Sequence, residues 1–210
     1  MEYRRLGQTG LKVSVVGIGC NNFGMRIDAD ATRAVVDAAV DAGINFFDTA
    51  DVYGGTRSEI MLGEALKGRR HEVVIATKFG GQVGEGVLKR GASRRHIIAA
   101  VEASLERLGT DYIDLYQQHF PDADTPLEET LRALDDLVRA GKVRYLGNLN
   151  YSGWQLADAD WTARSLGLHR FATAQNNFSL LERRVEREVL PACSASASRC
   201  CPTSRSRPGC

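Results

Sequence analysis

Four polar side chains stand at or just beyond short β-type segments of this 210-residue chain: Asp48, Tyr53, Lys78 and His119. Their types suit the reduction of a carbonyl group. When hydride reaches a carbonyl carbon from a nicotinamide, the developing alkoxide needs an acid to protonate it. A tyrosine can be that acid if an adjacent ammonium group lowers its pKa from the ordinary value of about 10.

Each of the four residues has one expected electrostatic role. Tyr53 is the candidate acid, and Lys78 supplies the ammonium group. Asp48 holds Lys78 and balances its charge, while His119 orients the substrate oxygen or relays a proton. Each residue taken singly also has a purely structural interpretation, because strand-end charges are more often caps or solvated groups, and lone tyrosines and histidines more often pack. The functional interpretation therefore depends on the combination.

The elements that must position these residues are β-type runs that alternate with amphipathic helical segments. The β-type runs cover residues 13–19, 44–47, 73–76, 112–116, 143–146 and 172–175. The helical segments cover residues 30–42, 59–66, 93–108, 127–140 and 154–166. Asp28 and Ser93 are candidate N-caps. This alternation predicts right-handed βαβ units and a parallel sheet.

A closed barrel fits this pattern better than an open doubly wound sheet. The glycine-rich run at residues 17–24 is a poor dinucleotide-binding fingerprint. The candidate reactive residues follow several successive strands, where a TIM barrel builds its active site. We therefore expect an α/β fold of the TIM (β/α)8 barrel type, with a β-hairpin of residues 3–6 and 11–13 capping its bottom. The barrel is expected to be incomplete, because about six βα units are recognisable.

The composition excludes several classes of function. A formal net charge of +1 and a pI near 7.7 give no electrostatic footprint for nucleic acid or an anionic membrane. No stretch approaches the roughly 18 apolar residues of a membrane span, and the N-terminus lacks a signal-peptide pattern. The cysteines show no metal-ligand spacing with histidine. We therefore expect a cytoplasmic protein without nucleic-acid, membrane or metal partners.

The strings around the four residues resemble the aldo-keto reductase family. FFDTADVYG at residues 46–54 resembles the family's signature around its aspartate and tyrosine, and IATKFG at residues 75–80 resembles its lysine strand. DLYQQH at residues 114–119, followed by Pro121 and Asp122, is similar to its histidine strand. The order, spacing and loop placement agree, and the resemblance runs from about Tyr3 to Cys193.

The resemblance implies NADPH-dependent reduction of aldehydes or ketones to alcohols, by direct hydride transfer to a small-molecule carbonyl substrate with Tyr53 as general acid. It also implies a site for the cofactor NADP(H). Residues 17–22, with Gly19, Asn21 and Asn22, would lie beneath the cofactor. Gln175 and Asn176 would face the nicotinamide carboxamide, and Asp48 would also serve the nicotinamide ribose.

One segment departs from the family's pattern. The family carries a Ser-Asn pair after the fifth barrel strand, and both residues contact the carboxamide. Here Asn150 matches the asparagine, but Leu149 stands where the serine belongs. Because losing one hydrogen bond to a buried amide costs about 1–3 kcal/mol, we expect weakened cofactor binding, or compensation from Asn148.

The last residues read differently from the rest. Residues 194–210 show no periodicity and almost no large apolar side chains, which is typical of disorder. We therefore divide the chain into a partial barrel domain, residues 1–193, and a disordered tail. Synonymous codons can be chosen so that another frame reads RFGLALLPYFPLASGL, which resembles the family's seventh strand. This favours a frameshift that removes the expected phosphate and adenine site, and resequencing of the gene tests it.

Two other functions are compatible with the sequence. The first is a subunit that binds the cofactor and regulates a partner without turnover, although the intact set of four residues argues against it. The second is an inactive, truncated remnant of the enzyme.

Overall fold

A computed structural model of the chain describes residues 1–196 and 198–203. The strands are β1 (Tyr3–Arg5), β2 (Lys12–Ser14), β3 (Ile18–Gly19), β4 (Phe46–Asp48), β5 (Val74–Phe79), β6 (Ile113–Gln118), β7 (Val143–Leu149), β8 (Phe171–Asn177) and β9 (Arg199–Thr203). The helices are α1 (Ala29–Asp41), α2 (Arg57–Ala65), α3 (Arg94–Leu108), α4 (Leu127–Arg139), α5 (Gly153–Ser165) and α6 (Val189–Ala195). Short 3₁₀ turns cover Arg70–Glu72, Val87–Lys89 and Arg184–Glu186.

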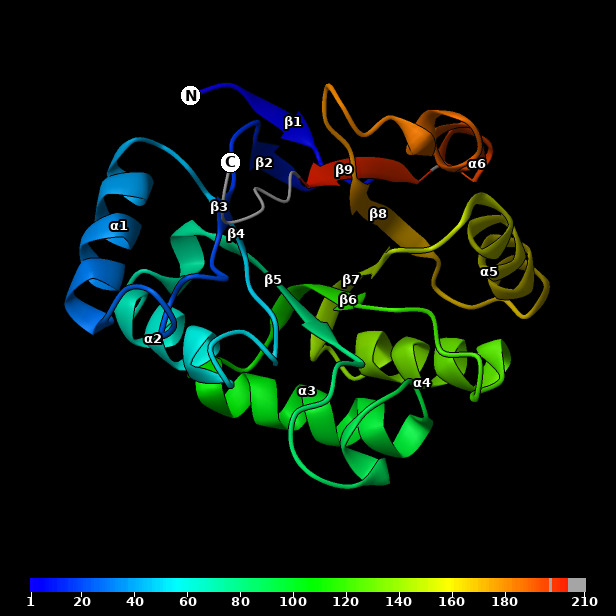
Figure 1. The fold of residues 1–210 in the computed structure, drawn as a ribbon, viewed down its shortest axis with the longest axis horizontal. Helices are drawn as coiled ribbons and strands as arrows, with labels where there is room; N and C mark the ends of the chain where they lie inside the picture. Colours follow the sequence, from blue (N-terminus) through cyan, green and yellow to red (C-terminus); the bar gives the residue numbers. More distant parts are fainter. Residues whose placement is uncertain (197, 204–210) are drawn as a thin grey trace.

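The strands β3 to β9 form one parallel sheet in chain order, and each connection carries a helix. Figure 1 shows the helices in an arc around the strands, from α1 through α3 and α4 to α6. This arrangement of a curved parallel sheet lined by helices confirms the expected α/β fold of the barrel type. None of the helices in the described residues is long and apolar enough to cross a membrane.

Local signals set the helix ends. The Asp28 side chain accepts a hydrogen bond from the backbone N–H of Ala31 at 2.9 Å, so it caps α1. The Ser93 side chain accepts one from the N–H of His96 and caps α3. Both caps confirm the sequence prediction. At the other end of α3, Gly109 ends the helix in the left-handed conformation, with φ 62°.

Two apolar clusters lie on the two sides of the sheet. The larger one fills the space between the sheet and the helices. The smaller one lies inside the curve of the sheet, where the buried residues Leu6, Ala76 and Leu115 pack together. Leu6 follows β1, so the antiparallel hairpin β1–β2 contributes to this inner cluster, as expected of a cap on the bottom of the barrel.

The C-terminal part differs from the expectation of a disordered tail from residue 194 onward. In the described residues, α6 continues to Ala195, and β9 pairs in parallel with the edge of β8. β9 pairs with β8 through backbone groups, which need no large side chains. Small side chains add two further contacts: the Ser198 hydroxyl donates to the Phe171 carbonyl oxygen at 2.8 Å, and Cys200 packs against the larger cluster. Residues 197 and 204–210 of the expected tail lie outside the described residues.

Candidate active site

The structure brings the four sequence-predicted residues together at the C-terminal ends of neighbouring strands. Asp48 ends β4, Lys78 lies on β5, and His119 follows β6, while Tyr53 lies in the turn between β4 and α2. The Lys78 Nζ atom lies 2.8 Å from Asp48 Oδ2 and 4.8 Å from the centre of the Tyr53 ring. The rings of Tyr53 and His119 meet edge to face, with centroids 5.9 Å apart.

Lys78 carries a fully buried charge, since its side chain is 0% exposed. Its ammonium group donates hydrogen bonds to Asp48 Oδ2 at 2.8 Å and to the carbonyl oxygen of Thr49 at 2.6 Å. Burial acts to lower the pKa of Lys78, but Asp48 and then the Tyr53 hydroxyl outweigh it, so that pKa is raised above its usual value. The group beside Tyr53 is therefore an ammonium ion at neutral pH.

Asp48 has two further hydrogen-bond donors. The Gln117 side chain donates from Nε2 to Asp48 Oδ1 at 3.1 Å, and the Gln175 side chain donates from Nε2 to Asp48 Oδ2 at 3.3 Å. Gln175 was expected at the cofactor, and the structure places it beside Asp48. The sequence interpretation missed Gln117. The available signal was strand alternation, because Gln117 shares an inward-facing parity with Leu115, two residues before it.

Asn150 ties two loops of the site together. Its backbone is left-handed, with φ 59°, and its Nδ2 donates to the carbonyl oxygen of His119 at 2.9 Å. Its own N–H donates to the carbonyl oxygen of Gln175 at 3.1 Å. His119 is also stacked on Phe120, with ring centroids 4.4 Å apart and an angle of 3° between the planes. These contacts fix the loops after β6 and β7 relative to each other and to strand β8.

Leu149 and Asn148 point to opposite faces of β7. Leu149 is the register partner of Gln175 and is buried, so it points into the site where the family pattern has serine. The amide of Asn148 lies on the other face and donates to the carbonyl oxygen of Thr173 at 3.4 Å. The structure therefore does not bring Asn148 to Asp48, and the compensation expected from it has no geometric support.

The other expected cofactor residues fall into two groups: Gly19, Asn21 and Asn22 lie at or just after the end of β3, and Asn176 lies on β8. Gly19 ends β3, and a Cβ atom added there would meet nothing within 4 Å in the described part of the chain. Asn21 is exposed, while the Asn22 carbonyl oxygen accepts backbone hydrogen bonds within its own turn. Asn176 is buried and donates from Nδ2 to the carbonyl oxygen of Tyr151 at 3.1 Å. Because it follows Gln175 directly on β8, it points to the opposite face of the sheet and does not face the same space as Gln175, contrary to the expectation. Side-chain amides, a carboxylate and open space at Gly19 suit the amide and ribose of a nicotinamide nucleotide.

A second buried polar cluster lies behind the Tyr53 loop. Glu59 is fully buried, pairs with Arg107 at 2.6 Å, and accepts a hydrogen bond from the Thr77 hydroxyl. Asp51 is 1% exposed. Burial and the charge of Glu59 raise the pKa of Asp51 to about 8, against the opposing effect of Arg107. Asp51 is therefore mostly a neutral acid at pH 7.

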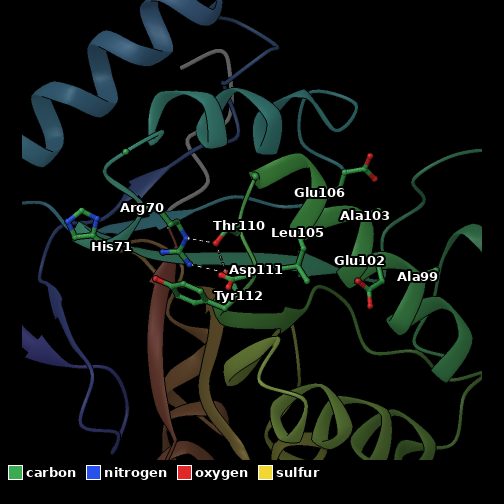
Figure 2. A pocket seen from close by; sticks show the side chains of 12 residues that line it. Arg70, His71, Ala99, Glu102, Ala103, Leu105, Glu106, Thr110, Asp111 and Tyr112 are labelled. Carbon is green, nitrogen blue, oxygen red and sulfur yellow. Dashed lines mark hydrogen bonds between the residues drawn. The ribbon is translucent and has the colours of Figure 1, made fainter.

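A groove on the outside of the molecule has no part in this site. Figure 2 shows it between the 3₁₀ turn before β5 and the end of α3, at the N-terminal ends of the strands. Arg70 crosses its floor, donates to the carbonyl oxygen of Tyr112 at 3.0 Å and pairs with Asp114 at 2.7 Å. The Arg70 guanidinium also lies 4.2 Å from the centre of the Tyr112 ring. The main cation of this groove is thus already paired.

Comparisons with known proteins agree with this geometry. The sequence model described as the Aldo/keto reductase family matches residues 15–203. A versiconal hemiacetal acetate reductase of Aspergillus parasiticus is 42% identical, over 92% of this chain and 64% of the relative. An uncharacterized oxidoreductase of Bacillus subtilis (strain 168) is also 42% identical, over 91% and 62%. A probable voltage-gated potassium channel subunit beta of Oryza sativa subsp. japonica is 40% identical, over 91% and 60%. The chain spans less than two thirds of the length of these relatives.

The raised pKa of Asp51 predicts how stability depends on pH. Between the ordinary aspartate value near 4 and about 8, the folded chain keeps a proton that the unfolded chain releases, so stability falls as pH rises. Asp51→Asn should remove this loss, which is up to about 1.4 kcal/mol per pH unit. Urea unfolding at pH 5, 6, 7 and 8 measures it. Asp158→Asn, on an exposed helix face, is the control; equal pH slopes for Asp51→Asn and the unaltered chain would contradict the prediction.

Proposed function

The chain belongs to the aldo/keto reductase family, and on that premise we propose that it reduces aldehydes or ketones to alcohols with NADPH, reversibly. The observation that carries the proposal is the buried ion pair of Lys78 and Asp48 beside the Tyr53 ring. This pair fixes a positive charge where a tyrosine can release a proton. A small-molecule carbonyl compound is the proposed substrate.

The residues of the chain divide the work of proton transfer. Tyr53 donates its hydroxyl proton to the carbonyl oxygen, and the ammonium group of Lys78 stabilises the phenolate that remains. Asp48 keeps Lys78 charged. His119, which meets the Tyr53 ring edge to face, orients the carbonyl oxygen between the two side chains. The bound nicotinamide supplies the hydride that the carbonyl carbon accepts.

Two groups of residues are proposed to hold the cofactor. Gln175 offers its amide group beside the carboxylate of Asp48, and Asn150, after the end of β7, lies beside Gln175. The loop that begins with Gly19 and continues through Asn21 and Asn22 provides the open floor. Leu149 is the one apolar side chain at a position where the family pattern supplies a hydroxyl.

A second candidate function has one observation in its favour. The rice relative is named as a probable potassium channel subunit beta. That name favours the alternative in which this chain binds a cofactor and regulates a partner protein without turnover. The complete set of Asp48, Tyr53, Lys78 and His119 favours the reductase. An inactive partial enzyme is the third candidate, and the turnover of the 210-residue chain distinguishes it from the first.

Tyr53→Phe tests the assignment of the acid. We expect turnover of NADPH with 4-nitrobenzaldehyde to fall by at least about 100-fold, because general acid catalysis contributes that much or more. NADPH binding, followed by fluorescence, should stay unchanged. Tyr112→Phe, in the outer groove, is the matched control and should keep full turnover. Unchanged turnover in Tyr53→Phe refutes the assignment, and NADPH binding without turnover in the unaltered chain supports the regulatory subunit.

Leu149→Ser tests the departure from the family pattern. The new hydroxyl would lie on the same face of the sheet as Gln175, the register partner of residue 149 on β8. One added hydrogen bond to a buried amide should tighten NADPH binding by about tenfold. Leu149→Ala removes the leucine without supplying a hydroxyl, so it controls for space alone. Dissociation constants from NADPH fluorescence compare the three proteins. Equal tightening by serine and alanine would show that leucine acts only through its bulk.

A further inference from the structure

We propose that Gln117 is a positioning residue, which holds the Asp48 carboxylate so that the Lys78 ammonium group stays directed at Tyr53. The inference rests on the proposed function, because the role it assigns is part of the same proton transfer. It starts from the contacts of the Asp48 carboxylate, which accepts hydrogen bonds from Gln117 and Gln175 in addition to the one from Lys78.

The two oxygens of Asp48 are held from different strands. Lys78 on β5 occupies Oδ2 at 2.8 Å, and Gln117 on β6 occupies Oδ1 at 3.1 Å. Gln175 reaches Oδ2 at 3.3 Å, which is beyond the common range for a strong N–H···O bond. Gln175 is therefore the donor that can turn from Asp48 toward a ligand, while Gln117 stays hydrogen-bonded to Asp48 Oδ1. With both oxygens engaged, the carboxylate cannot rotate away from Lys78.

The neighbouring strand leaves space for this glutamine. Lys78, Gln117 and Gly147 are register partners on β5, β6 and β7. A Cβ atom at Gly147 would lie 3.1 Å from Gln117 Cγ, 3.3 Å from its Oε1 and 2.5 Å from Thr173 Oγ1. Any side chain at position 147 would therefore push directly on Gln117. Gln117 is 1% exposed, so its side chain has no open solvent to move into.

Loss of the Gln117 amide would act on Lys78 through Asp48. The charged or titratable groups that act on Lys78 are Asp48 and Asp51 from the β4 end, Tyr53 from the following turn, and Cys20 from the turn after β3. Among them, Asp48 contributes most to keeping Lys78 protonated. A carboxylate free to rotate gives up part of that interaction, and the ammonium group then loses its proton at a lower pH.

Gln117→Leu in the full chain tests the proposal, since leucine keeps most of the volume and removes the donor. With NADPH and 4-nitrobenzaldehyde, we expect kcat to fall about 10- to 100-fold, the range of one hydrogen bond to a charged group. KM for the aldehyde should stay within about twofold. Nitrogen NMR of ¹⁵N-lysine-labelled protein, with Lys78 assigned through Lys78→Arg, should show that Lys78 deprotonates at a lower pH in Gln117→Leu.

A second pair of variants moves Gln117 without replacing it. Thr173→Ala removes a hydroxyl that has no hydrogen-bond partner among residues 1–196 and 198–203, so we expect unchanged turnover. Adding Gly147→Ala to Thr173→Ala leaves the new Cβ atom to press on Gln117 alone. The double variant should lower kcat and shift the Lys78 titration in the same direction as Gln117→Leu, with the fold checked by circular dichroism.

The outcomes separate this inference from the proposed function. A shifted Lys78 titration in a chain that shows no turnover even when unaltered supports the positioning of Lys78 and contradicts the reductase. A fall in kcat with an unchanged Lys78 titration overturns the inference, because Gln117 would then act on the substrate directly. An unchanged kcat in Gln117→Leu of an active enzyme also overturns it.

Discussion

The buried ammonium group of Lys78 is the constraint on which the site depends. A charge with no exposed surface is stable only when it is paired and hydrogen-bonded, and breaking such a pair typically costs about 3–5 kcal/mol. Asp48 and the carbonyl oxygen of Thr49 meet this requirement directly. The chain must therefore hold the ends of β4 and β5 in one register, and the positions of Tyr53 and His119 follow from it.

A second buried charge that is neutralised by an ion pair and a hydrogen bond lies outside the curve of the sheet. Glu59 on α2 is buried as completely as Lys78, and Arg107 on α3 neutralises it while Thr77 on β5 donates to it. Thr77 and Lys78 are neighbours that point to opposite faces of β5. One short strand therefore links the inner ion pair to the outer one, and the loop that carries Asp51 and Tyr53 lies between them.

Much of the fold and of the site could be predicted from the sequence, because alternation of strands and helices determines where strand ends meet. The caps Asp28 and Ser93 were readable from local chemistry. Gln117 was missed although it shares the inward-facing parity of Leu115, because an uncharged amide between Tyr116 and Gln118 gives no chemical signal until the strands are in register. The position of Asn148 relative to Leu149 was readable from strand alternation alone. The strand β9 was missed because pairing of backbone groups needs few large side chains.

The hairpin β1–β2 has a consequence for the ion pair above it. Ala76 and Leu115 precede Lys78 and Gln117 by two residues on the same faces, so the apolar cluster they form with Leu6 is the floor beneath the charges. An apolar floor keeps the local dielectric constant low, which strengthens the attraction between Lys78 and Asp48. The first residues of the chain thus shield the charges from below, although they are far from them in sequence, and the proposed cofactor and substrate would enter from the opposite end.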